Sequence, residues 1–141
     1  MSGHTLSVLL PETVESHWVD LRAMLAPGME HTNGEFDVDD ILTMVQSQRV
    51  FVATYKQDDK ISLAIVFEIL NYPKKCVLYV LAMGGAGFDR LMKFCWDALT
   101  ELALLVGASA IRGAVRPSME RYCRRVAPDA GRIYTILERG V

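Results

Sequence analysis

The sequence predicts a mixed α/β (α+β) fold, in which a mainly antiparallel central sheet of about six strands is flanked by helices. The chain has 141 residues, close to the most common size of one compact domain. Hydrophobic residues make up 51% and charged residues 23%, as in ordinary globular proteins. The spacing of the apolar residues changes from a helical to a strand period and back along the chain. We therefore expect a single domain over residues 1–141.

The expected order of elements is β-α-α-β-β-β-α-β-α-β. The residue ranges expected for them are a strand at Ser7–Leu10, a helix at Val14–Leu25, a helix after Asp37, strands at Val50–Tyr55, Ile61–Leu70 and Cys76–Met83, a long helix at Phe88–Val106, a strand at Ala108–Val115, a helix at Pro117–Val126 and a last strand at Arg132–Glu138.

The two expected N-terminal helices have separate start and stop signals. Apolar residues recur at helical spacing from Val14 onward, until Pro27-Gly28 ends the element. Asp37 stands where an N-cap is needed, because its side chain can accept hydrogen bonds from the first free backbone N–H groups. Phe36 and Ile41 stand at the two positions of a hydrophobic staple, which strengthens the prediction of a helix start.

The middle of the chain predicts an antiparallel meander. Val50–Tyr55 is rich in β-branched and aromatic residues, and short polar turns separate it from the next two apolar runs. Connections this short can join only antiparallel strands. Ile61–Leu70 is apolar on both faces, which is typical of a central strand. Further along, Gly107 ends the long helix and Pro117 opens the short one.

Charge and cysteine content exclude several classes of protein. The net charge of −2, from 15 basic and 17 acidic residues, gives no global attraction to nucleic acid or to a membrane surface. The three cysteines form no CxxC motif and indicate reduced thiols in a cytoplasmic protein. Met1–Ser7 lacks the pattern of a signal peptide, and no apolar run reaches the roughly 20 residues of a membrane span. The sequence leaves the oligomeric state open.

The order of elements resembles the GCN5-related N-acetyltransferase (GNAT) family over essentially the whole chain. In that family, the cofactor acetyl-CoA binds where the fourth strand gives way to the main helix. The resemblance implies that the cofactor-binding residues here are those of this junction: Leu81, Ala82, Met83, Gly84, Gly85, Ala86, Gly87 and Phe88. Tyr72-Pro73-Lys74-Lys75 and Gly84-Gly85 look in particular like small acetyltransferase-like proteins of tailed bacteriophages, which would place the protein in the host cytoplasm or the virion.

A glycine-rich turn before a helix also suits a pyrophosphate on physical grounds. It exposes backbone N–H groups at the positive end of the helix dipole. A dinucleotide-binding fingerprint would need a small residue at Arg90, and a P-loop would need Gly-Lys-Ser/Thr, so neither motif is present. The other interpretation is that the glycines only allow a tight turn from strand to helix.

The resemblance is imperfect at the phosphate loop. The family motif is Arg/Gln-x-x-Gly-x-Gly/Ala. With Gly87 as its first glycine, Gly84 stands in place of the Arg or Gln, and Asp89 in place of the second small residue. A carboxylate near a diphosphate is repelled by it, although Asp89 would also suit the first turn of a helix without any ligand.

Acetyl transfer to an amine needs a base for the amine proton and an acid for the departing thiolate. Glu68 is the candidate base, because it is the only carboxylate within Ile61–Leu70, where burial would raise its pKa. Tyr122 is the candidate acid, on the helix where the family carries its tyrosine, and Tyr79 is the second choice. The alternatives are that Glu68 faces solvent at a strand end and that each tyrosine only packs.

Other chemistries find less support in the sequence. The histidines His4, His17 and His31 have no spacing typical of metal ligands, so we expect no metal site. Nearby arginines could lower the pKa of Cys123, but a catalytic cysteine needs a partner histidine and none is close in the sequence.

Two functional hypotheses follow. The first is an acyl-CoA-dependent N-acetyltransferase that uses acetyl-CoA and acetylates an amine of unknown identity. The second is a catalytically silent GNAT-fold protein that serves as an interaction or virion structural protein, which the altered phosphate loop would favour. A shared fold cannot separate the two, because fold does not imply function.

Overall fold

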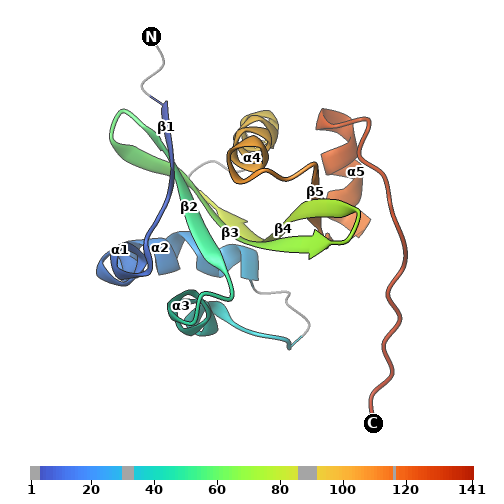
Figure 1. Cartoon of the computed structure of the whole chain (residues 1–141), viewed down its shortest axis with the longest axis horizontal. Helices are drawn as coiled ribbons and strands as arrows, with labels where there is room; N and C mark the ends of the chain where they lie inside the picture. Colours follow the sequence, from blue (N-terminus) through green and yellow to red (C-terminus); the bar gives the residue numbers. More distant parts are fainter. Residues whose placement is uncertain (1–3, 30–33, 86–91, 116) are drawn as a thin grey trace.

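The computed structural model describes residues 4–29, 34–85, 92–115 and 117–141 (Figure 1). The elements, in chain order, are β1 (His4–Val8), α1 (Pro11–Ser16), α2 (Trp18–Leu25), the 3₁₀ helix η1 (Ala26–Met29), α3 (Val38–Gln46), β2 (Phe51–Gln57), β3 (Lys60–Tyr72), β4 (Lys75–Gly84), α4 (Met92–Val106), β5 (Ala110–Gly113) and α5 (Pro117–Val126). Among the described residues, no helix has the length and apolarity that crossing a bilayer requires.

One sheet organises the structure. Its strands lie in the order β1-β2-β3-β4-β5, and every neighbouring pair is antiparallel except β4 and β5, which are parallel. A parallel pair needs a long crossover connection, and α4 provides it. The predicted mixed α/β fold with a mainly antiparallel sheet is therefore confirmed, although the sheet has five strands in the described part of the chain rather than about six.

Helices cover both faces of the sheet. Figure 1 shows α1, α2 and α3 on one side and α4 and α5 on the other. Side chains alternate along β3, so that Ala64 and Val66 pack into the core under α1–α3, whereas Leu63 and Ile65 pack into the core under α4. Both faces of this strand are buried, which explains why the predicted central strand is apolar throughout.

The start of α3 follows the predicted capping. The Asp37 carboxylate accepts hydrogen bonds from the backbone N–H groups of Asp39 at 2.9 Å and Asp40 at 3.1 Å. In return, the Asp40 carboxylate accepts from the Asp37 N–H at 2.9 Å, which completes a capping box. This arrangement fixes where α3 begins, and with it the segment 34–36 that leads into the helix.

The single helix predicted at Val14–Leu25 is two helices. His17 separates α1 from α2, with φ −109° and ψ 15°. The His17 N–H still bonds to the Thr13 carbonyl, and the Leu21 N–H to the His17 carbonyl, so the break is confined to one residue. The apolar spacing continues across the break, which is why the sequence pattern does not reveal it. The first strand is also displaced, from Ser7–Leu10 to His4–Val8.

The last predicted strand, Arg132–Glu138, is wrong. These residues are exposed and have no regular secondary structure. Side chains hold the segment instead, because Arg132 makes two hydrogen bonds to the Glu120 carboxylate, at 3.2 and 2.9 Å. A strand requires a backbone partner as well as β-forming residues, and the sheet of the described chain ends at β5 without including this segment.

Candidate functional site

Within the described residues, the end of β4 has no strand partner on the side where β5 lies, although it stays paired with β3 on the other side. β5 pairs with β4 only over Val77–Val80, whereas β4 itself continues to Gly84. A β-bulge lies at the same place, because Ala82 pairs with Val66 and Val80 pairs with Phe67, which leaves Leu81 without a partner in β3. Leu81 therefore has no Cα partner in either neighbouring strand. Such an edge can accept an extended ligand through its backbone N–H and C=O groups.

The predicted cofactor junction begins at this edge. Leu81 and Ala82 pack into the core under α1–α3, and Met83 packs against the core under α4. Gly84 is buried and Gly85 is half-buried. The remaining predicted cofactor-binding residues, Ala86, Gly87 and Phe88, lie outside the described residues, as does Asp89.

Gly84 and Gly85 have a packing role. A Cβ atom at Gly84 would overlap the backbone carbonyl of Met24 on α2, and one at Gly85 would overlap the carbonyl of Ser62 on β3. Only glycine permits such close approach of two backbones. The described chain therefore explains these two glycines without a ligand, so a phosphate-binding role depends on the loop that follows.

The structure brings Glu68 and Tyr79 together. They are direct partners across β3 and β4, and cross-strand neighbours have Cβ atoms roughly 4.5–5.5 Å apart. Glu68 lies two residues from Val66, so it shares the face of the sheet that α1–α3 cover. Both side chains are half-buried. This face is continuous with Leu81, which follows Tyr79 by two residues.

The electrostatic surroundings of Tyr79 favour its protonated form. Burial raises the pKa of Tyr79 above its ordinary value, and the carboxylates of Glu35 and Glu68 raise it further. Tyr134 acts in the same direction, whereas Arg112 lowers the pKa. A tyrosine with a raised pKa keeps its proton through neutral pH and can donate it.

Arg112 is a neighbour of Tyr79 that the sequence interpretation did not single out. It is the register partner of Tyr79 on β5. Its guanidinium donates hydrogen bonds to the hydroxyls of Tyr72 at 3.0 Å and Tyr134 at 3.5 Å, and its Cζ lies 5.5 and 5.8 Å from the two ring centroids. The sequence does contain a signal for Arg112. It is the one charged residue within the predicted strand Ala108–Val115, just as Glu68 is the one charged residue within Ile61–Leu70.

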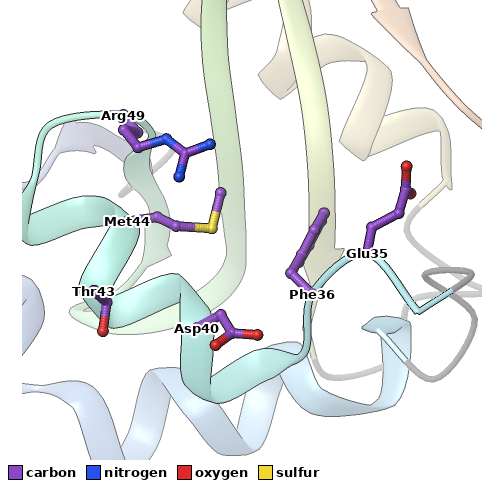
Figure 2. Close-up of a pocket in the computed structure, with 6 residues that line it drawn as sticks. All are labelled: Glu35, Phe36, Asp40, Thr43, Met44 and Arg49. Atoms are coloured by element: carbon purple, nitrogen blue, oxygen red, sulfur yellow. The ribbon is translucent and has the colours of Figure 1, made fainter.

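A hollow lies beside this face, next to α3. It has a volume of about 370 Å³ and is lined by Glu35, Phe36, Asp40, Thr43, Met44 and Arg49 (Figure 2). Figure 2 shows that Glu35 and Phe36 come from the segment that leads into α3, and that Asp40, Thr43 and Met44 come from α3 itself. Glu35, which lines the hollow, is also one of the carboxylates that raise the pKa of Tyr79.

Tyr122 is placed differently. It is half-buried on α5, which lies on the α4 side of the sheet (Figure 1). It is not among the groups that shift the pKa of Tyr79. Among the described residues, Tyr79 rather than Tyr122 is therefore the tyrosine beside Glu68, and the role of Tyr122 stays a prediction.

Two of the three cysteines, Cys95 and Cys123, do not resemble nucleophiles. Burial raises the pKa of the Cys95 thiol to about 11 and also raises that of Cys123. Both thiols are therefore protonated at neutral pH, whereas a nucleophilic cysteine needs a lowered pKa. No group of three or more side chains able to bind a metal gathers in the described part of the chain.

Comparison with solved structures shows which known fold the chain shares. No protein-family model and no curated protein matches the sequence. Among solved structures, a ribosomal-protein-alanine N-acetyltransferase from Brucella melitensis biovar Abortus 2308 matches with a TM-score of 0.65 and 14% identity, over 97% of this chain and 99% of that chain. The chain adopts the GNAT fold.

Other GNAT structures also match over nearly the whole length of both chains. The aminoglycoside N-acetyltransferase AAC(6')-Iy, in complex with CoA, has a TM-score of 0.61 and 16% identity, over 99% of this chain and 96% of that chain. A possible acetyltransferase from Clostridium difficile 630 has a TM-score of 0.64 and 11% identity, over 98% and 97%. The narrower resemblance to bacteriophage proteins finds no support in these comparisons.

Proposed function

We propose that the protein is an acyl-CoA-dependent N-acetyltransferase that transfers an acetyl group from acetyl-CoA to an amine. The observation that carries this proposal is the pairing of Glu68 with Tyr79 beside the bulged, unpaired end of β4. In this proposal, Glu68 serves as the proton acceptor and Tyr79 as the proton donor, and the adjacent strand edge holds the extended cofactor. GNAT-fold neighbours with acetyltransferase names support the same reaction class.

The residues present fit the chemistry of acetyl-CoA. The arm of CoA carries amide groups, and the free edge of Leu81–Gly84 offers backbone groups that can pair with them in the manner of an added strand. When bound, acetyl-CoA would supply the thioester. The residues predicted to meet its phosphates, around Gly87, lie outside the described residues.

The chain's own side chains account for the proton transfers. The amine nitrogen forms a bond to the acetyl carbon, and the carbon–sulfur bond of the thioester breaks. Glu68 accepts the proton that the amine loses, and Tyr79 gives its proton to the departing thiolate. Tyrosine already holds its proton at neutral pH at its ordinary pKa, and burial shifts the pKa of Tyr79 further in the same direction. Tyr122 is the alternative donor.

The acceptor amine would approach from the α3 side. Glu35 and Asp40 line the hollow there together with Arg49, so two carboxylates outnumber one guanidinium and the net negative charge would attract an ammonium group. The neighbours are named for different acceptors, aminoglycosides and a ribosomal-protein alanine, which share an amine. We therefore propose only that the acceptor is an amine.

Stabilisation by acetyl-CoA tests the proposal. A ligand present at 100 times its dissociation constant stabilises a protein by about 2.7 kcal/mol, which is a readily measured shift in thermal unfolding. We expect this shift with acetyl-CoA in the wild type and in Glu68→Gln, because Glu68 does not hold the cofactor. Release of free CoA in the presence of amine acceptors should accompany it in the wild type alone.

A pair of glycine variants supplies the control. Gly87→Leu should remove the shift, because the sequence places Gly87 in the phosphate loop. Gly131→Leu should keep it, because Gly131 is exposed and nothing lies near its missing Cβ. Absence of any shift in the wild type at millimolar acetyl-CoA would contradict the proposal and leave the catalytically silent interaction or virion protein.

A further inference from the structure

Arg112 is held by two tyrosines and by no carboxylate. Its Nη1 donates hydrogen bonds to the hydroxyls of Tyr72 and Tyr134, and its guanidinium lies over both rings. None of the ion pairs between described residues includes Arg112, although its side chain is half-buried. Charges that are partly removed from water are normally paired. The guanidinium is therefore a ready partner for an anion that comes from outside the chain.

One edge of the guanidinium has the geometry that a carboxylate requires. Both hydrogen bonds of Arg112 leave from Nη1, and no hydrogen bond between described residues uses its Nε or Nη2. Nε and Nη2 form a planar fork that can bind both oxygens of one carboxylate. The rings of Tyr72 and Tyr134 hold this fork in place, so little side-chain freedom is lost on binding. The two tyrosines are themselves 47% and 58% exposed, so a ligand can reach the fork.

The fork lies on the same face of the sheet as the proposed acid–base pair. Glu68, Tyr79 and Arg112 form one row across β3, β4 and β5, because each is the register partner of the next. From this row the guanidinium leans toward the β3–β4 hairpin, where it meets Tyr72. Leu81 lies in the opposite direction along β4. The row therefore separates the fork from the strand edge proposed for the cofactor.

Opposite charges gather at the two sides of this row. Glu35 and Glu68 are the carboxylates that raise the pKa of Tyr79. On the hairpin side, Lys75 stands opposite Tyr72 and is exposed, and no ion pair between described residues includes it. A ligand with an ammonium group at one end and a carboxylate at the other would complement both sides.

We propose that the acceptor amine carries a carboxylate several bonds away, and that this carboxylate binds the Nε–Nη2 fork of Arg112 while the amine reaches Glu68. This inference rests on the proposed acetyl transfer and narrows its acceptor to an amino acid or a short peptide. The row of Tyr79 and the row of Tyr72 are four residues apart, about 13 Å along a strand, and Arg112 reaches from the first toward the second. The spacing suits the two ends of a dipeptide, or the ε-amine and carboxylate of a lysine.

Paired ligands test this inference without acetyl-CoA. The ligands 6-aminohexanoate and glycylglycine carry both groups, whereas 6-aminohexanamide and glycylglycinamide lack the carboxylate. In NMR titrations, the wild-type protein should bind at least one acid about tenfold or more tightly than its amide, because a bidentate charge-assisted pair is lost with the amide. A preference for 6-aminohexanoate alone would assign an ω-amino acid, and a preference for glycylglycine alone would assign a peptide.

Two variants locate the subsite. Arg112→Gln should abolish the preference for the acid, because glutamine has no positive charge. Lys60→Gln removes one exposed positive charge at the other end of β3 and should keep the preference. Far-UV circular dichroism should be unchanged in both variants. Equal binding of acid and amide by the wild type would overturn the inference whether or not the variants fold, and so would a preference that survives Arg112→Gln.

Failure of the inference and failure of the proposed function are distinguishable. Stabilisation by acetyl-CoA without any preference for the acids would overturn the carboxylate subsite and leave acetyl transfer in place. A preference that depends on Arg112, in a protein that acetyl-CoA does not stabilise, would contradict acetyl transfer and support the subsite.

Discussion

Glu68 is the residue on which the proposed chemistry depends most directly. Its side chain is half-buried, and no ion pair in the described part of the chain ties its carboxylate to an arginine or lysine. A carboxylate held against a cation loses much of its basicity, because the positive charge favours the deprotonated form. Among the described residues, Glu68 has no such cation at its carboxylate, whereas Glu120 is bound to two arginines.

Replacing Glu68 with glutamine should lower turnover with an amine acceptor by roughly two to four orders of magnitude, the usual contribution of acid–base catalysis. The Michaelis constant for acetyl-CoA should stay nearly unchanged. Steady-state kinetics on purified protein measures both. Glu15→Gln, an exposed carboxylate on α1, is the control and should retain wild-type turnover. Equal turnover in wild type and Glu68→Gln would remove Glu68 from the mechanism.

The sequence predicted Glu68 and Tyr79 as separate candidates but not their pairing across β3 and β4. The two-residue connection Pro73-Lys74 sets Tyr72 opposite Lys75, and counting back along both strands sets Glu68 opposite Tyr79. That register follows from the turn length. The pairing of Tyr79 with Arg112 does not follow from a turn length, because β5 joins β4 only after a long crossover through α4. The bulge at Leu81 does not follow from the turn length either, and no local sequence pattern predicts it.

At the scale of the element, α3 is held at its start by local side chains. Asp37 and Asp40 satisfy backbone N–H groups that have no partner within the helix. Arg22 on α2 adds a hydrogen bond and ion pair to Asp39, at 2.7 Å. This pair is exposed and contributes little, so the capping box is the main local determinant of where α3 begins.

Asp37→Ala should lower the free energy of unfolding by about 1 kcal/mol, within the range of about 0.5–2 kcal/mol found for lost N-caps. Urea unfolding followed by circular dichroism measures the change. Asp129→Ala removes an equal charge from an exposed position after α5 and should change stability by less than about 0.5 kcal/mol. Equal effects in the two variants would mean that charge, not capping, determines the loss.

The contrast between α3 and the C-terminal segment shows which elements a sequence can predict. The cap, staple and apolar face of α3 lie within ten residues of one another, so the pattern alone contains the reason for the helix. The run Ile133–Leu137 has strand-forming side chains too. Its backbone, however, needs a partner from elsewhere, and local composition carries no information about that partner.

At the scale of the whole molecule, one sheet separates two hydrophobic cores. Leu21 of α2 is fully buried in the core on one face, and Leu102 of α4 is fully buried in the core on the other. Both cores use alternate residues of the same strands β2 and β3. Loss of either core would expose a face of that shared sheet, so we expect the chain to unfold as one unit.

Leu21→Ala and Leu102→Ala should each cost about 3–5 kcal/mol, the usual range for a buried leucine truncated to alanine. In each variant, tryptophan fluorescence and far-UV circular dichroism should report the same urea midpoint, because the two faces unfold together. The exposed Leu10→Ala is the control and should change the midpoint little. Separate midpoints for the two probes would show that the cores are independent units.

The two close backbone contacts at the end of β4 have a mechanical consequence. Gly84 lies against the carbonyl of Met24, and a Cβ at Gly28 would stand 2.7 Å from the carbonyl of Met83. Two backbones touching at two points have no side-chain layer between them to deform. The strand end and the α2–η1 segment therefore form a stiff joint. Met83 therefore cannot move toward α2 unless the α2–η1 segment moves with it.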